Sequence, residues 1–155
     1  MDKTNVMRLL DVAGIEYEGY EYDKTLTDGV SIAHVLKRDE NEVFKTLVTV
    51  GADRNHYVFV VPVNCTLDLK KAARAVKVKA IEMIKQKELL PLTGYIHGGC
   101  SPVGMKKPFT TVIDETAILF DKICVSAGRV GYQVRLAPDA LKDYVGATYA
   151  DIVKE

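Results

Sequence analysis

The stretch from Thr93 to Pro108 places the tightest constraint on the fold, because it is rich in the two residue types that interrupt regular structure. It holds four of the 11 glycines and two of the five prolines of the chain. Such a run cannot form a continuous helix or a central strand. Gly98 and Gly99 tolerate positive φ angles and leave room for a ligand beside the main chain, and Pro102 stiffens the exit. We expect either a rigid loop that presents backbone groups to a small ligand or a plain long connection.

The composition is that of a globular protein and narrows the classes of partner. With 155 residues, 48% of them hydrophobic, the chain is expected to form a single domain over residues 1–155. No apolar run approaches the ~18 residues that span a bilayer, and the first residues lack an apolar signal region. We therefore expect a cytoplasmic protein without a membrane segment. Basic and acidic residues number 21 each, so any contact with nucleic acid must come from a local patch.

The cysteines and histidines predict neither a disulfide framework nor a metal site. Cys65, Cys100 and Cys124 are widely separated, odd in number and form no C-x-x-C pair. We expect no metal and no cofactor. A reactive Cys100 would need a neighbouring base or positive charge to lower its pKa. The sequence indicates none, so Cys100 is expected to be a small apolar filler. His97, beside the glycines, is a candidate catalytic group.

The order of hydrophobic patterns predicts an α+β fold. Strands and helices do not alternate strictly, and no glycine-rich nucleotide fingerprint is present. Thr4, Thr66 and Thr148 are expected to cap helical segments, and Gly14 and Gly146 to end them. Strands are predicted over residues 15–22, 43–50, 57–61, 109–113, 123–126 and 131–136. Helices are predicted over residues 5–13, 31–37, 68–76, 84–90 and 138–145, with single turns over 115–120 and after Thr148.

A lysine lies inside the first strand of a predicted hairpin. Lys45 follows Phe44, so the two side chains should lie on opposite faces. A lysine in a strand needs a wet face or a partner for its ammonium, and an exposed edge strand would explain it as well as a binding site would. Together with the glycine loop and the small-residue turn from Ser126 to Gly128, it could form a pocket that binds through backbone groups and one ammonium. The chain contains no nucleophile elbow, zinc-protease motif or Walker loop.

The predicted helix over residues 68–76 carries the main concentration of positive charge. Lys70, Lys71 and Arg74 lie outside its apolar stripe, and further lysines follow. A solvated helix face and a phosphate-contacting surface both explain this pattern.

Four motifs carry a resemblance to a known family. They are Val43-Phe44-Lys45-Thr46-Leu47, Pro62 with Leu67-Asp68-Leu69-Lys70-Lys71, Thr93-Gly94-Tyr95 to Gly98-Gly99-x-Ser101-Pro102-x-Gly104, and Val125-Ser126-x-Gly128. In this order the chain closely resembles the YbaK/EbsC-type aminoacyl-tRNA deacylases, which are freestanding relatives of the editing domain inserted in bacterial prolyl-tRNA synthetases. The resemblance extends from about Val6 to Ile152.

The resemblance implies a fold, an activity and a set of site residues. The fold would be a mixed, partly barrel-like sheet surrounded by short helices. The activity would be hydrolysis of the ester that joins a wrong amino acid to tRNA, with cysteine on proline tRNA as the best-known case. In cysteine-specific members the substrate's own thiol would attack its carbonyl. The essential lysine of the family falls on Lys45. The substrate-binding positions fall on Tyr20, Gly98, Gly99, Ser101, Pro102, Ser126 and Gly128.

Several consequences of the resemblance stay open. Some relatives carry an acidic residue where this chain has Gln133. The acceptor end of an aminoacyl-tRNA would be the substrate, Lys70, Lys71 and Arg74 would be candidate tRNA contacts, and prolyl-tRNA synthetase is a candidate partner. The oligomeric state is not indicated.

One alternative function is that of a deacylase for another small amino acid such as alanine, for which water would be the nucleophile. The other is a non-catalytic protein that binds a nucleotide or a partner.

Overall fold

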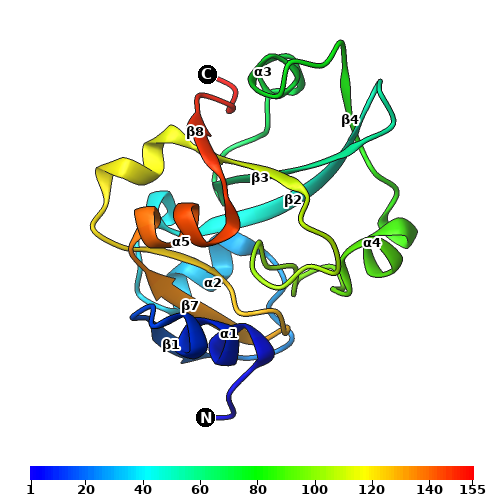
Figure 1. The fold of residues 1–155 in the computed structure, drawn as a ribbon. Coiled ribbons are helices and arrows are strands. Elements are labelled where there is room, and N and C mark those ends of the chain that lie inside the picture. The colour runs from blue at the N-terminus through cyan, green and yellow to red at the C-terminus, as the bar shows by residue number, and fades with distance from the viewer.

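The computed structural model describes residues 1–155 and contains five α-helices and two β-sheets (Figure 1). The helices are α1 (Asn5–Ala13), α2 (Gly29–Val35), α3 (Leu69–Ala75), α4 (Gln86–Thr93) and α5 (Pro138–Val145), with short 3₁₀ turns at Glu40–Glu42 and Glu115–Leu119. The strands are β1 (Glu18–Glu21), β2 (Phe44–Gly51), β3 (His56–Pro62), β4 (Ile81–Met83), β5 (Thr110–Asp114), β6 (Ile123–Ser126), β7 (Tyr132–Leu136) and β8 (Thr148–Ala150).

The larger sheet has the strand order β4-β2-β3-β5-β8. Strands β2 and β3 form the predicted antiparallel hairpin, whereas β3–β5 and β5–β8 pair in parallel. Strand β4 pairs only with residues Thr49–Gly51 at the end of β2. The first half of β2 is therefore paired on one side only, although β2 lies inside the sheet. This open half carries Lys45.

The smaller sheet has the order β1-β7-β6, with both pairs antiparallel. Its register places Tyr20 opposite Gln133 and Gln133 opposite Ser126, so these three side chains lie in one row on one face. The opposite face carries Val125 and Val134, which are fully buried.

The two sheets share a core without closing into a barrel. The larger hydrophobic cluster contains Phe44, Val60 and Ile113 from the large sheet together with Val125 and Val134 from the small one. An isolated parallel bridge joins Val43, the residue before β2, to Cys124 of β6. The predicted mixed α+β class is confirmed, and the two sheets do not close into a complete barrel.

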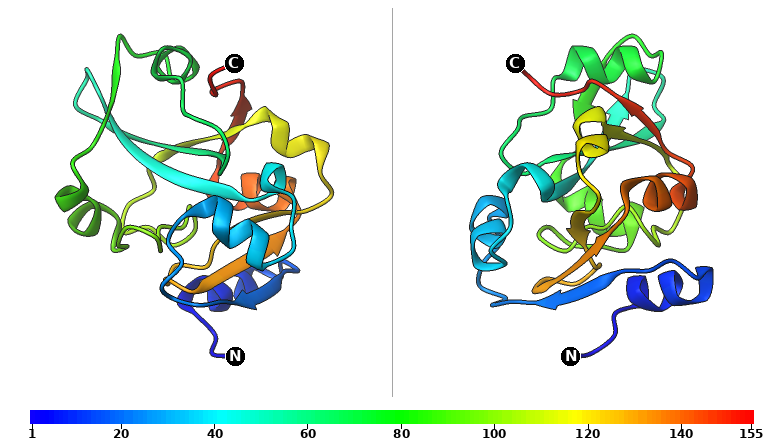
Figure 2. Two further views of the ribbon diagram at one scale, coloured as in Figure 1. Left: turned by 180° about the vertical axis from the view of Figure 1, so that it is seen from behind. Right: turned by 90° about the vertical axis from the view of Figure 1, so that its left-hand side faces the viewer.

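A second cluster lies on the other face of the large sheet, under α3. Ala72 and Ala73 of this helix pack against Phe59 and Val61 of β3. Figure 2 shows that α3 and the C-terminus lie at one end of the molecule, whereas α1 and the N-terminus lie at the other. None of the helices combines the length and the apolar character that crossing a membrane requires.

Local signals predicted most helix ends correctly. The Thr4 hydroxyl accepts a hydrogen bond from the Met7 N–H (3.2 Å), and Gly14 and Gly146 end α1 and α5 in the left-handed conformation. Pro138 occupies the first turn of α5. Each of these signals acts within a few residues.

Several local predictions were wrong. Asp68, not Thr66, caps α3, because its carboxylate accepts the N–H groups of Lys70 and Lys71 (both 3.0 Å). Thr148 begins strand β8 instead of a helical turn, since this segment pairs with β5. Strand β4 was not predicted, α2 runs from Gly29 to Val35 instead of from 31 to 37, and α4 runs from Gln86 to Thr93 instead of from 84 to 90.

Candidate active site

A cavity of about 340 Å³ opens beside the free half of β2. The start of α2, the first half of β2, the glycine loop after α4 and the ends of β6 and β7 line it. Among the predicted site residues, Lys45, Gly98 and Ser126 line the cavity. The cavity is also lined by His97, the candidate catalytic group, by Cys100, which was expected to be an apolar filler, and by Gln133, for which no role was predicted. Segments more than 80 residues apart in the chain thus meet at one site.

Lys45 is half-buried and forms no ion pair. Phe44 belongs to the core between the sheets, whereas Lys45 lies opposite Val61 on the other face, as the alternation of a strand requires. Because no carboxylate of the chain neutralises it, the Lys45 ammonium can contact an anionic or carbonyl oxygen of a ligand in the cavity.

The glycine loop reaches the cavity through Gly98. This residue has φ of 87°, a left-handed conformation that residues with a Cβ rarely adopt. Its N–H donates no backbone hydrogen bond, whereas the Gly99 N–H donates to the Ile96 carbonyl (3.0 Å). A Cβ on Gly99 would lie 3.0 Å from the Val130 nitrogen, so Gly99 allows the loop to approach the turn between β6 and β7.

Ser101 and Pro102 shape the loop from behind and do not line the cavity. Both are buried, and the Ser101 hydroxyl accepts a hydrogen bond from the Val103 N–H (3.2 Å). Gly128 has a packing role as well, because a Cβ there would lie 2.9 Å from Val6 and 3.0 Å from Tyr95. The structure therefore places these three residues in the support of the site.

Ser126 and Tyr20 lie in one row of the small sheet but face different surroundings. The Ser126 hydroxyl lines the cavity and accepts a hydrogen bond from the Gly128 N–H (3.2 Å). The Tyr20 hydroxyl donates to Glu18 (2.6 Å) and accepts from Arg38 (3.2 Å). Burial, followed by the hydrogen bond to Glu18, raises the pKa of Tyr20. Tyr20 is not among the residues that line the cavity.

Two polar atoms in the cavity wall have no hydrogen-bond partner. They are Oε1 of Gln133, whose residue is 5% exposed, and Oγ1 of Thr46. An unpaired buried polar group costs about 1–3 kcal/mol, so such groups in a cavity indicate a polar ligand. Neither Thr46 nor Gln133 was among the predicted site residues, although Gln133 was noted as the position where some relatives carry an acid. The signals were present, since Thr46 follows Lys45 and Gln133 lies between Tyr20 and Ser126 in the strand register.

The cavity contains no activated protein nucleophile. Burial raises the pKa of the Cys100 thiol to about 12, so the thiol is protonated at neutral pH. His97 is exposed and forms no hydrogen bond with a side chain that could act as a nucleophile. No group of three or more histidine, cysteine or carboxylate side chains comes together to hold a metal ion. The arrangement can bind and orient a polar substrate through one ammonium, hydroxyl and amide groups and the backbone.

The basic residues of α3 lie outside the cavity. Lys71 is neutralised, because its ammonium contacts Asp151 (3.0 Å) and the Val153 carbonyl (2.9 Å). Lys70 and Arg74 are exposed and form no ion pair. Of the three predicted tRNA contacts, only two therefore offer an uncompensated charge.

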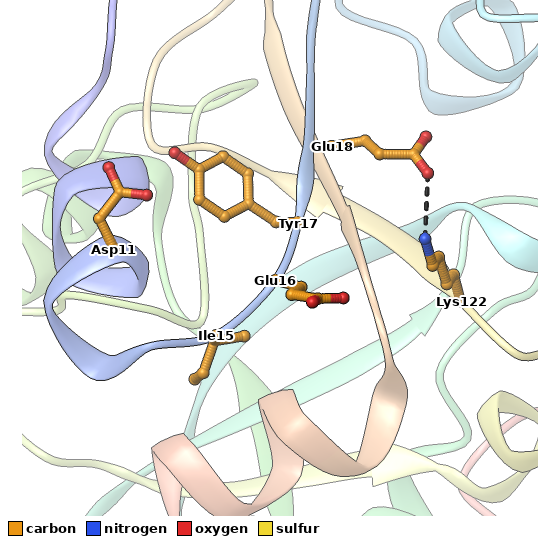
Figure 3. Close-up of a pocket in the computed structure, with 6 residues that line it drawn as sticks. All are labelled: Asp11, Ile15, Glu16, Tyr17, Glu18 and Lys122. Carbon is orange, nitrogen blue, oxygen red and sulfur yellow. Dashed lines mark hydrogen bonds and ion pairs between the residues drawn. The ribbon is translucent and has the colours of Figure 1, made fainter.

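A larger hollow of about 480 Å³, between α1 and β1, has a different character. Figure 3 shows that Asp11, Glu16 and Glu18 line it and that Glu18 pairs with Lys122 across 3.0 Å. Asp11 is paired with Lys3 outside it. None of the predicted site residues lines this hollow. Its acidic side chains are already partnered or face solvent, so it lacks the unpaired buried groups of the cavity beside β2.

Comparison with known proteins identifies the family. A family model of the aminoacyl-tRNA editing domain matches residues 25–144. The chain is 43% identical over 152 residues to EbsC of Enterococcus faecalis. The name of that protein assigns it, provisionally, as a Cys-tRNA(Pro)/Cys-tRNA(Cys) deacylase, and the match covers 97% of this chain and 93% of EbsC.

Solved structures share the whole fold. One that is described provisionally as a trans-editing enzyme for prolyl-tRNA synthetase has a TM-score of 0.85 at 25% identity, covering 99% of this chain and 100% of the other. The crystal structure of the protein APE2540 has a TM-score of 0.90 at 22% identity, covering 97% and 100%, a likeness of fold alone. Since the family model and the EbsC match both span most of its length, this chain belongs to the aminoacyl-tRNA editing-domain family.

Proposed function

We propose that the chain is a trans-editing enzyme that deacylates cysteine wrongly attached to proline tRNA. The observation that carries this proposal is the cavity beside β2, which joins an unpaired Lys45 to unsatisfied acceptors and a glycine loop but contains no activated nucleophile. A substrate that supplies its own nucleophile fits such a site. The names of EbsC and of the prolyl-tRNA synthetase trans-editing structure support the same substrate class.

In the proposed reaction, the side-chain thiol of the esterified cysteine attacks the carbonyl carbon of the same residue. A C–S bond forms, the C–O bond to the ribose breaks, and the thiol proton passes to the leaving ribose oxygen. Water then opens the small cyclic thioester and releases free cysteine. Lys45 orients the acceptor end through its phosphate or ribose, and the backbone at Gly98 and Gly99 holds the aminoacyl group. Correct positioning alone lowers such barriers by several kcal/mol.

The geometry refines the role of each predicted residue. Gly98 offers a free N–H at the cavity, whereas the N–H of Gly99 is already bonded to Ile96. Ser126 faces the ligand directly, whereas Ser101, Pro102 and Gly128 act by holding the loop and the turn in place. We place residues 1–155 in one editing domain that works in the cytoplasm, with prolyl-tRNA synthetase as the partner that selects the tRNA.

Hydrolysis of alanine from the same tRNA is the second candidate, because the cavity would accept a smaller side chain and water could enter it. Thiol chemistry separates the two functions. A cysteine-specific enzyme leaves alanine and serine esters intact, since neither has a thiol. An enzyme that activates water removes the alanine ester.

The decisive test compares deacylation of Cys-tRNA(Pro), Ala-tRNA(Pro) and Ser-tRNA(Pro) by the wild type, Lys45→Ala and the control Lys79→Ala, a change at an exposed lysine. We expect loss of the cysteine ester alone, slowed at least about 100-fold in Lys45→Ala and unaffected in Lys79→Ala. Preferred loss of the alanine ester would assign the second function. If no ester is lost faster than in buffer, the chain is a binding protein and not a deacylase.

A further inference from the structure

Four exposed lysines flank α4 without a carboxylate partner. Lys85 and Lys87 lie at the start of the helix, whereas Lys106 and Lys107 lie beside its end. The Lys106 N–H donates to the Thr93 carbonyl (3.1 Å), which fixes this lysine against the helix terminus. None of the four takes part in an ion pair. We call these four residues the α4 lysines.

The two segments that carry the α4 lysines, residues 81–93 and 104–108, contain two acidic residues. Glu88 belongs to α4 itself, and its carboxylate accepts the Lys85 N–H (3.4 Å), so it faces the start of the helix. Glu82 is exposed on β4. The four lysines therefore outnumber the acids, and this flank is positive although the chain as a whole has no net charge.

Helix α4 also forms part of the cavity wall. Leu89 of α4 lines the cavity, and the chain continues from the helix into His97 and Gly98, which line it as well. The eight residues of α4 span about 12 Å. A strand of a nucleic-acid duplex carries three or four phosphates over that length. A ligand whose terminal group enters the cavity can thus place its backbone along this helix.

Other charged surfaces fit a polyanion less well. On α3, Lys71 is neutralised by Asp151, and no residue of α3 lines the cavity. The hollow between α1 and β1 exposes the carboxylates of Asp11, Glu16 and Glu18 (Figure 3), which would repel phosphates. The α4 flank is the basic surface that borders the cavity.

We propose that the α4 lysines bind the phosphate backbone of the tRNA acceptor stem while the aminoacyl ester occupies the cavity. The proposal rests on the proposed function, because it names the surface that receives the same substrate. It replaces α3 as the principal tRNA contact. Each lysine–phosphate contact releases a counterion, so binding through this surface weakens with added salt.

The test compares two variants that remove the same amount of charge. One is Lys85→Gln/Lys87→Gln/Lys106→Gln, and the control is Lys70→Gln/Arg74→Gln/Lys79→Gln. Affinity for uncharged proline tRNA is measured over a range of salt concentrations. Deacylation is measured with the full-length Cys-tRNA(Pro) and with a cysteinylated CCA trinucleotide, which lacks the acceptor stem that the α4 lysines are proposed to bind.

We expect the α4 variant to lower the slope of log Kd against log salt by about two to three and to reduce kcat/KM for the full-length substrate about tenfold or more. Its rate with the trinucleotide should match that of the wild type, and the control should lower the slope less than the α4 variant does. An unchanged slope in the α4 variant, or a lower slope only in the control, would overturn the proposal. So would a loss of binding to prolyl-tRNA synthetase with an unchanged tRNA slope, since it would assign α4 to a protein partner.

Failure of the proposed function would be seen separately. If the wild type cleaves neither the full-length ester nor the trinucleotide ester, the chain is not this deacylase. The salt dependence of tRNA binding still shows whether α4 contacts nucleic acid.

Discussion

Gln133, which lines the cavity, carries a buried amide oxygen without a hydrogen-bond partner. The neighbouring Thr46 hydroxyl has none either. In the unliganded protein these atoms reduce stability, because they lost their contacts with water on folding. A bound substrate would restore the lost hydrogen bonds. The two side chains are thus better explained by binding than by folding.

If the unpaired oxygen of Gln133 lowers stability but serves binding, its removal should change the two properties in opposite directions. Methionine has a similar shape to glutamine without the amide, so Gln133→Met tests this. We expect the free energy of unfolding of Gln133→Met to rise by about 1 kcal/mol and kcat/KM for Cys-tRNA(Pro) to fall. Urea unfolding and steady-state kinetics measure the two quantities. A variant that is less stable than the wild type would show that Oε1 already has a favourable role in the fold, contrary to this interpretation.

Cys100 illustrates a residue whose chemistry depends on burial. Its position among glycines resembles that of a nucleophile, but burial keeps the thiol protonated. The sequence alone supported the same conclusion, because no base or cation was predicted beside it. The polar role of Gln133 was harder to predict, since it depends on the pairing of three strands that are far apart in the chain.

At the scale of elements, the glycine loop and α4 determine the shape of the site. Helix ends were predictable because capping and left-handed glycines act locally. Strands β4 and β8 were not, because three-residue segments gain their structure only from pairing with β2 and β5. The position of Lys45 could be predicted only in part. Its alternation with Phe44 was predictable, but the open half of β2 depends on where β4 stops pairing.

The left-handed conformation of Gly98 gives a prediction with a built-in control. A Cβ at Gly98 would touch nothing closer than 3.6 Å, and one at Gly146 would touch nothing within 4 Å, while φ is 87° and 68° respectively. Alanine at either position should therefore cost about 1–2 kcal/mol through backbone strain alone. Urea unfolding of Gly98→Ala and Gly146→Ala measures this cost.

The two variants should differ in activity. Only Gly98→Ala alters a residue that lines the cavity, so we expect it to reduce deacylation while Gly146→Ala keeps the wild-type kcat/KM. Equal activity in both variants would show that the backbone conformation at Gly98 has no part in substrate binding.

For the whole molecule, acidic side chains fix turns and helix starts throughout the chain. Hydrogen bonds lower the pKa of several aspartates that cap helices or turns, through Ser31 for Asp28, Tyr57 for Asp53 and the Lys71 N–H for Asp68. On the small sheet, hydrogen bonds from Tyr20 and then from Lys122 lower the pKa of Glu18 to about 2. The fold thus favours the ionised form of carboxylates spread over both sheets.

These lowered pKa values determine the direction of the acid dependence. A carboxylate with a lower pKa in the folded state stabilises the fold above its unfolded pKa, and this contribution disappears as the pH falls through the folded pKa. For Glu18 the window runs from about pH 4.5 down to about pH 2. We therefore expect the difference in unfolding free energy between the wild type and Glu18→Gln to narrow over this range.

Urea unfolding at several pH values tests this expectation, with Glu16→Gln as the control because Glu16 is exposed and has no ion-pair partner. The Glu16→Gln curve should run parallel to that of the wild type. Since Glu18 is also largely exposed, added salt should reduce the difference at pH 6 by screening its contacts with Lys122 and Arg135. If the unfolding free energy of Glu18→Gln ran parallel to that of the wild type over this pH range at low salt, the contacts of Glu18 with Lys122 and Arg135 would not stabilise the fold.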